Sequence, residues 1–275
     1  MKASYNRPIG MFDSGFGGLT VARAVIDLLP NEDLIYIGDT ARYPYGPKPA
    51  SDVRGFAIEL ATSLVRDFDA KLIVVACNTA ASVALDELQQ SLSVPVIGVV
   101  DPGARALVTA TKNNRVAVIG TVGTISSMAY ETAVARASLE ISRKISLTAA
   151  ACPGFVEFVE RNETSGDAVT QLAEKLLAPI KDADVDALLL GCTHYPYLSE
   201  VIARVMGAAV KIINSADSTA TVVNQALQQN RIARPSEPGR KSAHDFYSSG
   251  DVEHFAKLGQ RFLGPELVVA QRWPK

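Results

Sequence analysis

Two cysteines stand in matched contexts, each at the end of an apolar run and each followed by polar residues. Residues 72–76 lead into Cys77–Thr79, and residues 187–191 lead into Cys192–His194. A thiol at a helix N-terminus meets the positive end of the helix dipole and backbone N–H donors, which lower its pKa and favour the nucleophilic or basic thiolate. We therefore expect both thiols to take part in a reaction, although either cysteine alone would more simply be explained as a small buried hydrophobic residue.

Two thiols across one cleft suit an inversion at carbon. If one thiolate removes a proton from one face of a carbon and the opposite thiol returns one to the other face, the stereocentre inverts without a cofactor. An amino-acid Cα–H is far less acidic than a thiol, so the site must stabilise a developing carbanion with preorganised donors and exclude water. The Thr, Asn and Ser side chains near these runs could supply donors, whereas Cys152, followed by Pro153, lacks such a setting and is assigned to packing.

The elements that must position these residues follow a repeated pattern. Short runs rich in Val, Ile and Leu alternate with segments of helical period, which predicts parallel strands joined by crossover helices, an α/β fold. In such sheets ligands bind at the carboxyl ends of the strands, where both cysteines stand. The expected strands are residues 8–13, 33–39, 71–77, 94–99, 115–120, 145–152, 185–192, 210–214 and 245–249.

Helical periodicity is clearest in two segments. The apolar positions from Val53 to Phe68 follow the i, i+3, i+4, i+7 spacing of an amphipathic helix, for which Ser51 is the expected N-cap. Residues 169–180 repeat the spacing before the seventh strand. After the first strand, residues 12–18 include three glycines that could let backbone amides approach a ligand, although a tight turn capped by Asp13 or Ser14 would explain them equally well.

Composition excludes several classes of protein. The 275 residues are 48% hydrophobic and 20% charged, with 27 Lys and Arg against 29 Asp and Glu. A net charge of −2 provides no excess positive charge for binding nucleic acid, and no apolar run approaches the ~18–20 residues of a membrane span. With no signal-peptide pattern and three cysteines, too few and too odd for a disulfide framework, we expect a cytoplasmic protein.

The motifs together resemble those of the glutamate racemases, in the aspartate/glutamate racemase superfamily. The resemblance runs in order from the first strand to about Asn214 and is most specific at the two cysteine motifs. It implies a cofactor-independent isomerase that uses no metal and interconverts L- and D-glutamate for peptidoglycan synthesis. The motifs that carry it are residues 12–20, 38–40, 44–46, 76–80, 120–124, 151–153 and 191–196.

The resemblance also assigns roles to residues. Cys77 would remove the α-proton of D-glutamate and Cys192 that of L-glutamate, assisted by Asp13 and His194 respectively. Glu160 is the better match to a family glutamate near the site, because a proline is usual at position 157, where this chain has Glu157. The expected substrate-binding residues are Asp13, Ser14, Tyr45, Gly46, Asn78, Thr79, Thr124, Thr193 and His194.

The family fold implies two pseudo-symmetric α/β lobes, each a mainly parallel sheet flanked by helices, with the active site in the cleft between them. On this basis the first lobe comprises residues 1–99 and 214–275, and the second comprises residues 100–213. The expected partners are glutamate and, as is usual in the family, a second copy of the chain in a homodimer, with no nucleic acid and no membrane.

Three alternatives stay open at this stage. A racemase of aspartate or another acidic amino acid would share the motifs, because pocket size cannot be read from them. A cysteine hydrolase or transferase would need only one thiol and usually a covalent intermediate. A non-catalytic amino-acid binding protein would need no cysteine at the cleft and usually carries an export signal.

Overall fold

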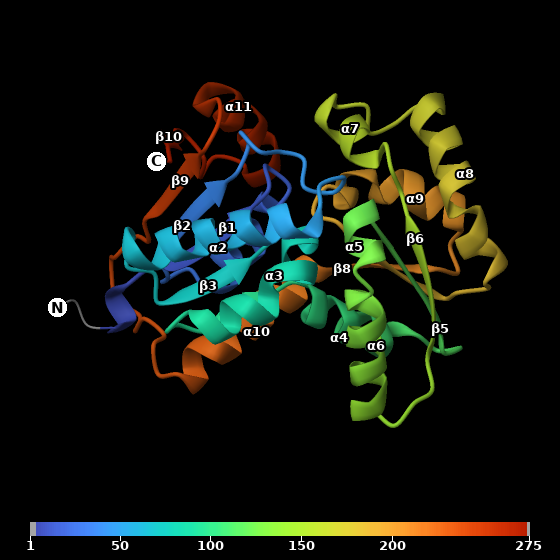
Figure 1. Ribbon diagram of the computed structural model, residues 1–275, viewed down its shortest axis with the longest axis horizontal. Helices are drawn as coiled ribbons and strands as arrows, with labels where there is room; N and C mark the ends of the chain where they lie inside the picture. The colour runs from blue at the N-terminus through green and yellow to red at the C-terminus, as the bar shows by residue number, and fades with distance from the viewer. Residues whose placement is uncertain (1–3, 274–275) are drawn as a thin grey trace. The chain divides into compact units, whose positions relative to one another are not determined.

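The structure, a computed structural model, describes residues 4–273. The chain divides into two compact units: one contains the residues up to Val99 and from Ala216 onward, and the other contains Val100–Ser215. Each unit is built around one parallel sheet with helices against it (Figure 1). Within the described residues, no helix combines the length and the apolar character that crossing a membrane requires.

The sheet of the first unit has six strands in the order β10-β9-β2-β1-β3-β4. Its central strands are buried along their whole length, as expected of parallel strands covered on both faces. The strands β9 and β10, drawn in red in Figure 1, come from the last part of the chain; β9 pairs with β2, and β10 pairs with β9. The strand bounds are β1 Ile9–Asp13, β2 Leu34–Gly38, β3 Leu72–Val75, β4 Val96–Gly98, β9 His244–Ser248 and β10 Gln271–Arg272.

The helices that accompany this sheet are amphipathic. α2 buries Val53, Ala57 and Leu60 along the predicted apolar face. It begins at Ala50, after an extended Pro49 whose carbonyl accepts the first helical hydrogen bonds, so the expected N-cap Ser51 is wrong and Ser51 lies in the first turn. The bounds are η1 Ser4–Asn6, α1 Leu19–Leu28, α2 Ala50–Arg66, α3 Asn78–Ser91, α10 Ser215–Gln229 and α11 Val252–Leu263.

The sheet of the second unit has four strands in the order β6-β5-β7-β8, again all parallel. α8 buries Val169, Ala173, Leu177 and Ile180, the face that the periodicity predicts. The strands are β5 Arg115–Gly120, β6 Ser146–Ala151, β7 Ala187–Gly191 and β8 Lys211–Asn214. The helices are α4 Val100–Ala110, α5 Val122–Ser126, α6 Ala129–Glu140, α7 Phe155–Glu160, α8 Asp167–Asp182, η2 Tyr195–Leu198 and α9 Ser199–Met206.

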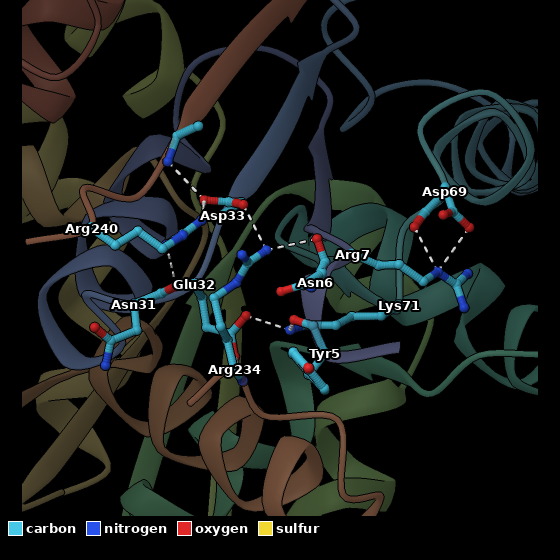
Figure 2. A network of polar contacts seen from close by, with 11 residues as sticks. Tyr5, Asn6, Arg7, Asn31, Glu32, Asp33, Asp69, Lys71, Arg234 and Arg240 are labelled. Carbon is cyan, nitrogen blue, oxygen red and sulfur yellow. Dashed lines mark hydrogen bonds and ion pairs between the residues drawn. The ribbon is translucent and has the colours of Figure 1, made fainter. Parts of the chain in front are cut away.

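A charged network lies at the amino ends of β2 and β3 (Figure 2). Glu32, just before β2, pairs with Lys71, just before β3, and both side chains are almost fully buried. Arg234 and Arg240, in the segment between α10 and β9, both pair with Asp33. The network therefore ties the returning segment of the chain to the starts of two central strands.

Candidate functional site

The first unit gathers its expected site residues at the carboxyl ends of β1, β2 and β3, which are neighbours in the sheet. Asp13 is the last residue of β1 and is fully buried. Its Oδ2 accepts hydrogen bonds from the backbone amides of Gly15 and Gly18, both at 3.1 Å. A Cβ on Gly18 would lie 2.6 Å from the Asp13 Cβ and 2.8 Å from the Tyr36 hydroxyl, so this position requires glycine because the neighbours approach so closely.

Opposing effects act on the pKa of the Asp13 carboxyl group. Burial raises its pKa above the ordinary value, although hydrogen bonds from Gly18 and Gly15 and the neighbouring Cys77 thiol act to lower it. The raised pKa makes Asp13 a better proton acceptor than an exposed aspartate.

Cys77 is the N-cap of α3, as the sequence predicts. Its Sγ accepts from the amide of Ala80 at 3.5 Å and donates to the hydroxyl of Ser14 at 3.6 Å. Burial, followed by the charge of Asp13, raises the pKa of Cys77 to about 12. The expectation that the helix N-terminus lowers this pKa is therefore wrong, because loss of hydration outweighs the helix, and the resting group is a thiol.

The remaining expected residues of this unit lie on the same sheet edge in two segments. Asn78 and Thr79 open α3 and are buried beside Cys77. Tyr45 and Gly46 lie in the loop between β2 and α2, but the Tyr45 ring is buried and its hydroxyl donates to the carboxylate of Asp39. The Tyr45 side chain is therefore engaged within the protein.

The second unit places Cys192 and His194 directly after β7. The Cys192 Sγ lies 4.0 Å from Nδ1 of His194, and both residues are buried. The expected helix N-terminus at Cys192 is wrong, because the chain first forms the short 3₁₀ turn η2 and α9 begins only at Ser199. The neighbouring imidazole is thus one group that can act on this thiol, and the N-terminus of α9 lies further along the chain.

Burial lowers the pKa of His194 to about 4, so its imidazole is neutral near pH 7. Its Nε2 lies 3.9 Å from Oε1 of Glu160, the last residue of α7, whose side chain is about one quarter exposed. That separation is too long for a direct hydrogen bond. A neutral imidazole can accept a hydrogen bond from the Cys192 thiol, although its lowered pKa makes it a weaker base than an exposed histidine.

Thr124 and Thr193 complete the expected set. Thr124 is fully buried in α5, where its amide donates to Oγ1 of Thr121 at 3.2 Å and the two hydroxyls lie 3.0 Å apart. Thr193 is buried between Cys192 and His194. Since β5 and β7 pair directly, Thr124 lies at the same sheet edge as Cys192.

Cys152 has a different setting. It follows β6, its carbonyl accepts from the Tyr195 hydroxyl at 3.0 Å, and burial raises the pKa of its thiol to about 12. No acid–base group contributes to that shift in the described part of the chain. The setting agrees with a packing role.

Two residues of these sheet edges carried no role in the sequence interpretation. Asp39, fully buried after β2, accepts from three side chains. Tyr130 on α6 is fully buried, and a Cβ on Gly191 would lie 2.9 Å from its ring. Burial and then the charge of Cys192 raise the pKa of Tyr130. Asp39 could have been identified from its position at a strand end, whereas no spacing pattern in the sequence identifies Tyr130.

Comparison with known proteins gives a consistent result. The family model described as Asp/Glu/Hydantoin racemase matches residues 19–223. A glutamate racemase of Parafrankia sp. is 48% identical over 97% of this chain and 94% of its own length. The crystal structure of a Bacillus anthracis glutamate racemase superposes with a TM-score of 0.89 at 40% identity, covering 98% of both chains.

A second solved structure extends the comparison to a ligand complex. The glutamate racemase of Francisella tularensis, solved with D-glutamate, gives a TM-score of 0.86 at 34% identity over 98% of this chain and 96% of its own. The buried thiol at a strand end of each unit and the two parallel sheets are consistent with these matches, which cover nearly the whole chain. This chain belongs to the Asp/Glu/hydantoin racemase family.

Proposed function

We propose that the protein interconverts L- and D-glutamate, with Cys77 and Cys192 as two acid–base groups that act on opposite faces of one α-carbon and with no cofactor. One observation carries the proposal. Each unit presents a buried thiol directly after a strand, with a buried acid–base group beside it: Asp13 at Cys77 and His194 at Cys192. A cysteine hydrolase would use only one such pair.

The protonation states suggest how the conversion of L-glutamate to D-glutamate proceeds. With L-glutamate bound, the Cys192 proton passes to His194, whose basicity must then exceed that of the ligand-free protein, and the thiolate removes the α-proton, leaving the electron pair on Cα. Cys77, a thiol because burial raises its pKa to about 12, then delivers its proton to the other face. D-glutamate leaves with Cys77 as thiolate, Cys192 as thiol and His194 protonated, and exchange with water then returns one proton from His194 to Cys77.

The reverse direction uses Asp13. With D-glutamate, the Cys77 thiol must first lose its proton, and the adjacent carboxylate, whose pKa burial raises, is the acceptor. Cys77 then removes the α-proton and Cys192 returns one to the opposite face.

Substrate recognition is assigned to buried polar groups at the two sheet edges. We propose that Glu160 supports His194 from 3.9 Å, and that Tyr45 and Gly46 contribute backbone amides. Preorganised donors of this kind stabilise the charge that develops on the substrate carboxylate as the α-proton leaves. The other groups proposed to hold the carboxylates and ammonium are Asp13, Ser14, Asn78, Thr79, Thr124, Thr193 and His194.

Glutamate is the proposed substrate because the related proteins named above are glutamate racemases and one of them was solved with D-glutamate. We further propose that the product D-glutamate enters peptidoglycan synthesis, that the protein acts in the cytoplasm and that it forms a homodimer. Gel filtration with light scattering tests the last of these, since a homodimer has twice the chain mass of 29.3 kDa.

Exchange in heavy water tests the reaction directly. Reduced protein incubated with either pure glutamate enantiomer, without pyridoxal phosphate or added metal, should produce the other enantiomer carrying deuterium at Cα. Inversion without deuterium, or no inversion by folded protein, contradicts the two-thiol mechanism. Aspartate in a parallel incubation tests the alternative substrate, because faster turnover of aspartate would overturn the choice of glutamate.

Single-thiol variants test the assignment of the bases. Cys77→Ser and Cys192→Ser should each abolish racemisation, because a serine hydroxyl is a far weaker acid than a thiol. Cys152→Ser is the matched control and should keep most of the activity. Alkylation of Cys77 and Cys192 that glutamate slows would agree with both thiols lying at the substrate.

A further inference from the structure

The loop of residues 39–46 is held by side chains that are engaged within the first unit. The Tyr45 ring is buried, packs 5.6 Å from the ring of Phe56 and donates its hydroxyl to Asp39. Under the proposed function, this loop offers backbone amides to glutamate. Its shape therefore depends on what fixes the Tyr45 side chain.

Asp39 is the centre of that support. Its carboxylate accepts from the Tyr45 hydroxyl, from Nε of Arg42 at 2.6 Å and from Oγ of Ser249 at 2.6 Å. Its own amide donates to the carbonyl of Asp13 at 2.9 Å. One fully buried residue thus joins the loop and the end of β9 through its carboxylate, and the strand end that carries Asp13 through its amide.

Arg42 extends the support to the last strand of the sheet. Its Cζ lies 4.3 Å from the centre of the Phe56 ring and 5.7 Å from that of the Trp273 ring, and its guanidinium also pairs with Glu59. An arginine next to two aromatic rings is held by cation–π attraction as well as by its ion pairs. Arg42 therefore depends on Trp273 for one of its contacts.

Trp273 is itself firmly anchored. It is 3% exposed, its indole Nε1 donates to Oγ of Ser63 on α2 at 2.9 Å, and its amide donates to the carbonyl of Ser248 at 2.9 Å. The pairing of β10 with β9 brings it there. A continuous set of contacts thus runs from β10 through Arg42 and Asp39 to Tyr45.

We propose that Asp39, Arg42 and Trp273 are positioning residues for glutamate binding, which hold the 39–46 loop in its ligand-binding shape. This rests on the proposed racemase function. When the support is weakened, the loop samples other shapes and the ligand must order it on binding, which weakens apparent affinity by the fraction of protein that is binding-competent. Proton transfer in the bound complex uses other groups and changes less.

Steady-state kinetics of three variants test the proposal. Tyr45→Phe removes one oxygen atom, Asp39→Asn weakens the acceptor, and Trp273→Ala removes the ring beside Arg42. Each should raise the KM for glutamate about tenfold while kcat falls by less than about threefold, and Trp273→Phe should restore most of the wild-type KM. Tyr247→Phe, a hydroxyl deletion on β9 where the ring packs against Phe68, is the matched control and should leave KM unchanged.

Fluorescence gives a second readout that does not need turnover. Trp273 is the single tryptophan of the chain, so its emission reports on this site. In Asp39→Asn and Tyr45→Phe, emission of the ligand-free protein should shift to longer wavelength as water reaches the indole, with no shift in Tyr247→Phe. An unchanged KM with a lowered kcat, or an unchanged emission, overturns the proposal.

Failure of the proposed function is distinguishable from failure of this inference. If wild-type protein does not racemise glutamate, the proposed function fails, and the ligand-free emission shifts still decide whether Asp39 and Tyr45 are coupled to Trp273. If wild-type protein racemises glutamate but Trp273→Ala keeps its KM, only the positioning role is refuted.

Discussion

The buried pair Lys71–Glu32 makes a quantitative prediction about the first unit. The exposed fractions of the two side chains are 1% and 5%, so neither charge is hydrated (Figure 2). Burial lowers the pKa of Lys71 despite the pairing with Glu32. The attraction between the two charges therefore does not fully compensate their loss of water.

Removing both partners should cost much less than the two single removals added together. Lys71→Met leaves the Glu32 carboxylate buried with only the Arg234 amide donating to it, at 2.7 Å, and should cost about 3–5 kcal/mol of the free energy of unfolding. The double variant Lys71→Met/Glu32→Leu removes both of these buried charges. Its remaining cost is the unpaired Arg234 amide and the Tyr5 carbonyl, on the order of 1–3 kcal/mol for each buried group that water does not reach.

Urea unfolding followed by Trp273 emission measures this directly, because the single tryptophan lies in the same unit as the pair. The double variant should be more stable than the sum of the two single variants predicts by at least ~2 kcal/mol, the coupling expected of groups in one network. Additive losses, or single losses below about 1 kcal/mol of the kind seen for exposed ion pairs, would refute the reasoning.

Three further predictions concern His194, Asp186 and Gly18. His194 should reduce stability by about 3 kcal/mol as pH falls from 6.5 to about 4, because the unfolded chain binds its proton in that window and the folded chain does not; unfolding of His194→Asn should lack this slope. Although burial acts to raise the pKa of Asp186, hydrogen bonds from Thr111 Oγ1 and two loop amides lower it, so the stability advantage of wild type over Asp186→Asn should shrink as pH falls below 3.8; an unchanged advantage at pH 2.5 would contradict this. Gly18→Ala should cost about 1–3 kcal/mol and lower racemisation by displacing Asp13, whereas Gly55→Ala, with nothing within 4 Å of the new Cβ, should do neither, as parallel denaturation and activity assays would reveal.

The α/β fold was predictable because its central strands are continuous apolar runs. All nine expected strands are present with small shifts at their ends. The tenth, β10, could not be predicted, because Gln271 and Arg272 are exposed and polar and only pairing with β9 makes them a strand. Edge strands of this length carry no periodic signal.

The positions of the residues at the two sheet edges could be predicted from the sequence, but their pKa shifts could not. A strand end followed by Cys-Asn-Thr correctly indicates the N-cap of α3. The direction of the Cys77 pKa could not be obtained, because burial and the charge of Asp13 depend on the packed surroundings. The local structure after Cys192 could not be predicted either, because the four residues of the 3₁₀ turn η2 precede α9.

The partners of Asp39 explain why positioning residues are harder to find than reacting ones. A reacting group can be recognised from the sequence when a residue of reactive type follows a predicted strand, as Cys77 and Cys192 do. Asp39 acts through Ser249 and, by way of Arg42, through Trp273, which reach it only because β9 and β10 return to the edge of the first sheet. The loop that offers amides to glutamate is therefore shaped by the last part of the chain, and its precision depends on the sheet order as much as on the local sequence.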